Sequence, residues 1–195
     1  MTSYLPSLTC HSRYVINIPP EGCDKEAEKM VEVRQGSITD VECDVAVVNL
    51  FRGVKHPGGA TGAMDRALGG AITRAIADFD GDLGDCLLIE GGGEVKARKV
   101  IVVGLGGASA FGYEEVEKAS YAAAKRALEE GARSLATIIH GAGIRGLDPV
   151  NAARKVVEGS ERAFKELGRE AELLIVEFDP DKAKRIEKEI GRGEG

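Results

Sequence analysis

Three glycine-rich clusters hold the residues of this sequence whose types and spacing could do chemistry. They are HPGGATG at 56–62, GLGG at 104–107 and GAGIRG at 141–146. Glycine accepts a positive φ at no steric cost, and its missing side chain lets a ligand approach the backbone. Consecutive N–H groups of such a loop can point at one anion, especially where a helix begins. The clusters therefore predict a phosphate or diphosphate site, although tight turns also use glycine in proteins that bind nothing there.

Each cluster follows an apolar run that predicts a β-strand. We expect strands at 14–18, 43–50, 86–90, 100–104, 135–140 and 173–178. We expect helices at 63–77, 113–130, 150–167 and 181–190, where apolar residues recur every three to four positions. Continuous Val/Ile/Leu runs that alternate with helices indicate an α/β fold whose largely parallel sheet is covered on both faces. All three clusters then lie at the carboxyl edge of the sheet, where such folds bind ligands.

Length and composition indicate one domain over 1–195. Within it, residues 1–33 form an N-terminal extension, with a turn and short helix at 19–30, and residues 191–195 a frayed tail. The net charge of −6 argues against a protein that holds nucleic acid by neutralising many phosphates. We find no membrane-spanning run and no secretory signal, and we expect a cytoplasmic protein. High charge and the absence of tryptophan would suit a thermophile.

The cysteines and histidines do not suggest a metal site or a bound cofactor. Four cysteines at 10, 23, 43 and 86 and three histidines at 11, 56 and 140 are scattered, with no C-x-x-C pair. We expect structural thiols, no metal and no cofactor.

Other nucleotide motifs fit poorly. The cluster at 141–146 matches G-x-G-x-x-G, but it follows a late strand, and no acidic residue ends a strand about twenty residues further on. Neither G-x-x-x-x-G-K-[ST] nor G-x-S-x-G occurs. A dinucleotide-dependent oxidoreductase, a nucleoside triphosphatase and an α/β-hydrolase are therefore disfavoured.

From residue 34 almost to its end, the chain resembles a macro domain. GSITDVECDVAVVN at 36–49 is similar to that family's opening motif, GGATGAMDRALG at 58–69 to its first phosphate-binding loop, RKVIVVG at 98–104 to its central strand, and GAGIRGLDP at 141–149 to its second loop. GAMDRALGGAITRAI, GDLGD and KVIVVGLGG also resemble the amino-terminal domain of leucyl aminopeptidases, which shares the macro fold. The chain is too short to include the zinc-binding peptidase domain as well, so we expect no peptidase activity.

The resemblance implies a three-layer α/β/α fold with a mixed, mostly parallel sheet and a cleft for ADP-ribose. One wall would be Gly58, Gly59, Ala60, Thr61 and Gly62, and the other Gly141, Ala142, Gly143, Ile144, Arg145 and Gly146. Ser37, Ile38 and Asn49 would complete the ligand-binding set.

Three departures from the family pattern bear on function. Ser37 stands where the family has an aspartate that recognises adenine, and Arg52 where many hydrolytic members have an asparagine that holds the distal ribose. The first loop also lacks the aspartate that assists catalysis in some members. Arg145 replaces a usual aromatic residue and adds a cation beside the expected phosphates.

Several polar residues near these loops have two interpretations. Arg52, Lys55, His56 and Arg145 either complete phosphate binding or are solvated loop charges, and His56 is the one candidate for a general base. His140 is either structural or faces the ligand. Phe178 either packs on an adenine ring or fills the core. Asp148 before Pro149 and Asp179 before Pro180 fit helix N-caps.

The leading hypothesis is a stand-alone module that binds ADP-ribose or a related nucleotide diphosphate, with weak or no hydrolase activity. An ADP-ribosyl hydrolase is the first alternative. A ligand-free regulatory or assembly domain, related to the aminopeptidase amino-terminal domain, is the second, and a cleft closed by side chains would favour it. The sequence is compatible with a homo-oligomer.

Overall fold

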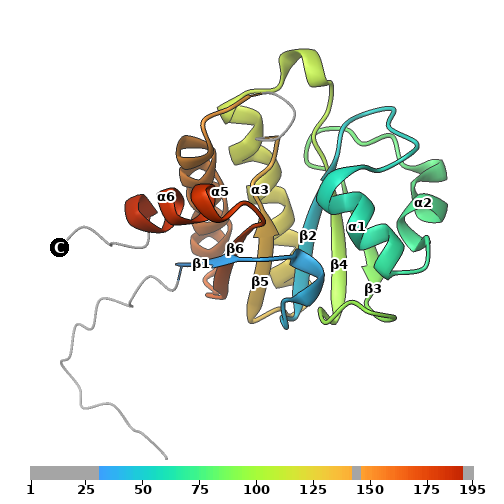
Figure 1. Cartoon of the computed structure of the whole chain (residues 1–195), viewed down its shortest axis with the longest axis horizontal. Coiled ribbons are helices and arrows are strands. Elements are labelled where there is room, and N and C mark those ends of the chain that lie inside the picture. The colour runs from blue at the N-terminus through green and yellow to red at the C-terminus, as the bar shows by residue number, and fades with distance from the viewer. Residues whose placement is uncertain (1–30, 142–145, 191–195) are drawn as a thin grey trace, which may run out of the picture.

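A six-stranded sheet of order β1-β6-β5-β2-β4-β3 forms the centre of the computed structural model, which describes residues 31–141 and 146–190 (Figure 1). The strands are β1 (Val31–Gln35), β2 (Val45–Leu50), β3 (Cys86–Glu90), β4 (Lys99–Gly104), β5 (Ser134–Ile138) and β6 (Glu172–Glu177). Neighbouring strands are parallel except β3 and β4. The predicted mixed, mostly parallel sheet is confirmed.

Helices cover both faces of this sheet. They are α1 (Gly59–Ala67), α2 (Ala71–Ala75), α3 (Tyr113–Glu129), α5 (Pro149–Leu167) and α6 (Pro180–Ile190), with short 3-10 turns η1 (Ile38–Asp40), η2 (Ile76–Asp78) and η3 (Ala108–Ala110). One core joins the sheet to α3, α5 and α6, and includes Val116, Val156 and Ile186. A second core joins the opposite face to α1 and α2, and includes Met64 and Ile72. These two cores make the three-layer α/β/α architecture that was predicted.

The central strands are apolar because neither of their faces meets water. In β2, Val45, Ala46, Val47 and Val48 are each at most 1% exposed, and they alternate between the two cores. β2 pairs with β4 along its whole length and with β5 from Val45 to Val47. Its carboxyl end, at Asn49 and Leu50, is thereby held at the edge of the sheet between its neighbours.

β1 was not predicted. Its sequence, VEVRQ, alternates apolar and polar residues, and the strand is partly exposed at an edge of the described sheet, where it pairs with β6. Such a strand lacks the long apolar run that marked the others. The expected strand at 14–18, the helix at 19–30 and the tail at 191–195 lie outside the described residues.

The single helix expected at 63–77 is wrong. α1 begins earlier, at Gly59, and ends at Ala67, and α2 is a separate helix. The break lies at Gly69 and Gly70, whose φ values of +61° and +81° are left-handed and cannot continue a right-handed helix. The Asp65 carboxylate bridges the break, because it accepts hydrogen bonds from the Thr73 backbone N–H at 2.9 Å and from the Thr73 hydroxyl.

The predicted starts of the last two helices are confirmed. Asp148 Oδ1 accepts hydrogen bonds from the N–H groups of Val150 and Asn151, each at 3.1 Å, at the start of α5. Asp179 Oδ1 does the same for Asp181 and Lys182 at the start of α6. Both caps satisfy N–H groups that a helix leaves without partners.

α3 and α5 pack closely at Gly159. A Cβ atom at that position would lie 2.3 Å from the Glu117 carbonyl oxygen and 2.9 Å from the Tyr121 backbone nitrogen. The missing side chain therefore lets the two helix backbones approach one another.

Candidate functional site

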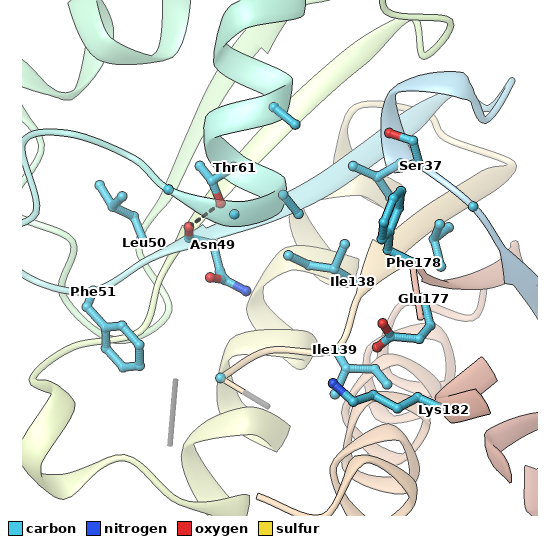
Figure 2. Close-up of a pocket in the computed structure, with 18 of the residues that line it drawn as sticks. Ser37, Asn49, Leu50, Phe51, Thr61, Ile138, Ile139, Glu177, Phe178 and Lys182 are labelled. Atoms are coloured by element: carbon cyan, nitrogen blue, oxygen red, sulfur yellow. Dashed lines mark hydrogen bonds between the residues drawn. The ribbon is translucent and has the colours of Figure 1, made fainter. Parts of the chain in front are cut away.

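A cleft of about 650 Å³ lies at the carboxyl edge of the sheet. β1, β6, β5 and β2 are parallel, so their carboxyl ends meet at this edge, and residues just after each of them line the cleft. The first turn of α1 and Lys182 of α6 also line it (Figure 2). Of the predicted ligand-binding residues, the structure brings together Ser37, Ile38, Asn49, Gly58, Gly59, Ala60, Thr61 and Gly141.

The α1 wall of the cleft presents free backbone N–H groups. Gly58 is the N-cap and offers no side chain to the first turn, and the first backbone bond of the helix runs from the Gly62 N–H to the Gly58 carbonyl at 2.9 Å. The N–H groups before Gly62 have no partner within the helix. A Cβ atom at Gly58 or at Gly59 would meet no atom of the described residues within 4 Å, so these leave the space beside the two glycines open.

Thr61 and Gly62 have structural functions in this wall. The Thr61 hydroxyl donates to the Asn49 carbonyl oxygen at 2.7 Å and fastens α1 to the end of β2. Gly62 is buried and does not line the cleft. A Cβ atom there would lie 2.6 Å from the Pro57 carbonyl oxygen, so glycine is needed for close packing.

Ser37 and Phe178 lie together at one end of the cleft (Figure 2). The Ser37 side chain caps η1, accepting from the Thr39 N–H at 3.4 Å and sharing a hydrogen bond with the Thr39 hydroxyl at 2.7 Å. Phe178 is 75% exposed, so the interpretation that it fills the core is wrong. Its backbone carbonyl accepts a hydrogen bond from Gln35 Nε2 at 3.1 Å. This end offers a hydroxyl and an exposed aromatic ring.

Asn49 reaches the cleft from the end of β2 and contacts a buried histidine. Its Nδ2 lies 3.1 Å from Nδ1 of His140, which follows β5. His140 is 0% exposed, and its burial lowers the pKa of the ring to about 4. His140 is thus a buried, neutral imidazole at pH 7, and it contacts the cleft residue Asn49.

The second predicted wall is only partly within the described residues. Gly141 lines the cleft with a φ of +73°, and a Cβ atom there would lie 2.2 Å from Cε1 of Phe111. Phe111 in turn packs edge-on against Phe51, with ring centroids 5.0 Å apart. Gly146, with a φ of +65°, does not line the cleft. Ala142, Gly143, Ile144 and Arg145 lie outside the described residues.

The glycine cluster at 104–107 lies outside the cleft lining. A Cβ atom at Gly104 would lie 2.0 Å from the Asp82 carbonyl oxygen, and the Gly106 carbonyl accepts from the Arg52 N–H at 2.9 Å. This cluster allows tight packing of a turn.

Three loop residues expected near the phosphates do not line the cleft. Arg52 forms an ion pair with Asp82 at 2.5 Å, Lys55 donates to the Ala77 carbonyl at 3.5 Å, and His56 is exposed. Arg52 and Lys55 are thus solvated loop charges.

Glu177 and Lys182 are the ionisable residues among the described cleft lining, and sequence reasoning missed both. Glu177 Oε1 accepts from the Asp179 N–H at 3.0 Å, which holds the turn into α6. Lys182 comes from the first turn of α6. Pro180 begins that helix directly after the end of a predicted strand, and this signal could have placed Lys182 near the cleft.

Cys43 and Cys86 are free thiols inside the fold. Burial raises the pKa of Cys43 to about 11 and that of Cys86 to about 12, which keeps both protonated. Within residues 31–141 and 146–190, no group of three or more His, Cys, Asp or Glu side chains is arranged to hold a metal ion. The helices of that part of the chain are all too short or too polar to cross a bilayer.

Comparison with solved structures relates the fold to macro domains. The Trypanosoma brucei macrodomain in complex with ADP-ribose superposes with a TM-score of 0.70 and 25% identity, over 82% of this chain and 68% of that one. A tomato leucine aminopeptidase mutant superposes with a TM-score of 0.61 and 18% identity, over 80% of this chain and 34% of that one. The macro-domain-like fold that the sequence predicted is confirmed.

Sequence comparison relates the chain to aminopeptidases. A probable cytosol aminopeptidase of Alkaliphilus metalliredigens is 37% identical over 76 residues, which are 38% of this chain and 15% of the relative. The chain spans less than half the length of each curated relative it matches. The model of the cytosol aminopeptidase family's N-terminal domain matches residues 47–165, more than half of the chain. This match shows the family, and the macro-like sheet agrees with it. The chain belongs to the family of cytosol aminopeptidase N-terminal domains.

Proposed function

We propose that the cleft binds ADP-ribose or a related nucleotide diphosphate. The observation that carries the proposal is the α1 wall, where a helix of nine residues opens onto the cleft with no side chain capping its N-terminus. Unpaired N–H groups and the positive end of the helix dipole both favour an anion at this place. The diphosphate would lie against Gly58, Gly59 and Ala60.

The size and lining of the cleft support a nucleotide. Its volume of about 650 Å³ lies within the range of small-molecule sites, and most of its lining is apolar or glycine. At the end marked by Ser37, the exposed Phe178 ring offers a flat surface on which a base can stack (Figure 2). Ser37 can meet the base only with a hydroxyl, so we expect weak discrimination between bases.

The structural relatives support the same ligand class. The T. brucei macrodomain has been solved in complex with ADP-ribose and with ADP, and the fold match to it covers more than four fifths of this chain. Gly58, Gly59 and Ala60, from the loop that resembles the first phosphate-binding loop of macro domains, line the cleft.

Weak or absent hydrolysis is part of the proposal. A general base must reach the reacting group, and His56 does not line the cleft. The open cleft also favours a ligand-binding module over a ligand-free assembly domain.

Calorimetric titration with ADP-ribose, ADP and nicotinamide adenine dinucleotide tests the proposal. We expect ADP-ribose to bind with micromolar affinity. The absence of heat with all three ligands at millimolar concentration would refute it.

Substitution of Gly58 provides a sharper version of this test. Gly58→Asp places a carboxylate beside the expected phosphates and caps α1, so we expect affinity to fall at least about a hundredfold while stability is kept or increased. Gly58→Ala is the matched control, because its Cβ atom meets nothing within 4 Å, and we expect it to bind within about tenfold of the wild type. Equal affinities for the two variants would show that the phosphates lie elsewhere.

A further inference from the structure

Asn49 is the polar side chain at the end of the cleft opposite Phe178. Figure 2 shows its amide extending from the end of β2 into the space between Phe51 and Ile138. The neighbouring lining residues at this end, Leu50, Phe51 and Val54, are apolar. A ligand group that reaches this end therefore meets the Asn49 amide and, beside it, the Thr61 hydroxyl, whose proton is already donated to the Asn49 carbonyl oxygen.

The contact with His140 determines which atom of the amide is available. An amide nitrogen donates and cannot accept, so the 3.1 Å contact between Asn49 Nδ2 and His140 Nδ1 makes Nδ1 the acceptor. The neutral ring then carries its proton on Nε2, and this atom is buried with no hydrogen-bond partner among residues 31–141 and 146–190. With Nδ2 engaged, Oδ1 is left without a donor in the described part of the chain.

The backbone of Asn49 is held independently. Its carbonyl oxygen accepts from the Thr61 hydroxyl at 2.7 Å, so the residue is tied to α1 by its main chain and to the end of β5 by its side chain. Both bonds limit the ways in which the amide can turn.

We propose that His140 is a positioning residue that holds the Asn49 amide with its carbonyl oxygen toward the cleft. This end of the cleft then offers an acceptor to a hydroxyl-bearing group, such as a sugar, and a phosphate oxygen without a proton cannot use that acceptor. The inference rests on the proposed function, because it concerns the group attached to the far side of the diphosphate in the same ligand.

The test compares ADP-ribose with ADP, which ends where the sugar would begin. Wild-type protein is expected to bind ADP-ribose more tightly than ADP. His140→Leu removes the acceptor for Nδ2, and we expect its affinity for ADP-ribose to fall about fivefold, with the affinity for ADP unchanged within twofold. His140→Gln supplies a side-chain carbonyl as acceptor and is expected to recover most of the difference.

A purely structural role for His140 gives a different result. Both ligands would then lose affinity equally in His140→Leu, and this outcome would overturn the proposal. Ser120→Ala is the control for loss of a buried polar group, because Ser120 is 3% exposed and its hydroxyl donates to Val116 within α3. We expect it to leave the ratio of the two affinities unchanged.

A second measurement works on the free protein and separates this proposal from the proposed function. Long-range proton–nitrogen NMR correlation reports which imidazole nitrogen carries the proton, with the His140→Gln spectrum identifying the signal. We expect the proton of His140 on Nε2 at pH 7, and a proton on Nδ1 would overturn the proposal. If the wild type binds neither nucleotide, the proposed function is refuted. The NMR measurement of the His140 tautomer still tests the contact with Asn49 in that case.

Discussion

Acidification of the buried His140 ring is expected to destabilise the protein between pH 6.5 and pH 4. The ordinary pKa of the group is 6.5, and burial lowers it to about 4 in the folded protein. Between these values the unfolded chain binds the proton and the folded chain does not, so the free energy of unfolding falls as the pH falls. Each pKa unit corresponds to about 1.4 kcal/mol, so the full loss is about 3 kcal/mol.

Urea unfolding followed by circular dichroism at several pH values between 7.5 and 4.5 measures this loss. His140→Gln has no titrating group at the site, so the difference between the two proteins isolates the histidine. Other groups titrate in both proteins and cancel; for example, Asp44 has a pKa lowered mainly by the hydrogen bond from the Arg133 N–H. Parallel pH profiles for wild type and variant would refute the reasoning, because they would mean that His140 titrates equally in both states.

Two further predictions concern the helices that support the sheet. Gly159→Ala is expected to lower the free energy of unfolding by about 2 kcal/mol, because its Cβ atom would lie 2.3 Å from the Glu117 backbone oxygen and force α3 and α5 apart. A loss under about 0.5 kcal/mol in urea unfolding would show that the helices separate easily. Asp148→Ala removes the cap of α5 and is expected to cost about 1 kcal/mol. Asp148→Ser, which can still cap, should recover most of that, and equal urea midpoints for the two variants would contradict the capping argument.

Much of the fold was predictable because buried strands carry their own signal. Runs such as VAVVNL are apolar on both faces, and they are strands for that reason. β1 carries no such run, since an edge strand exposes part of each face. The helix break was missed because residues on both sides of Gly69 and Gly70 keep a helical apolar spacing, while the left-handed φ of each glycine ends α1.

Part of the candidate site was also predictable from the sequence, and part of it was not. The Gly58 to Thr61 wall was predictable, since glycine chemistry and its place after an apolar strand are both local. The pairing of Asn49 with His140 joins residues 91 positions apart and depends on how β2 and β5 lie in the sheet. Lys182 lines the cleft because of where α6 packs, and the sequence of α6 alone does not predict that position.

The two bonds that hold Asn49 also have a thermodynamic consequence for recognition. Thr61 holds the main chain of the residue and His140 holds its side chain before any ligand arrives, so the start of α1 and the end of β5 already have their spacing in the free protein. Little conformational entropy remains for a ligand to remove at this point. A ligand that binds there as proposed therefore loses little of its binding energy to ordering these two segments.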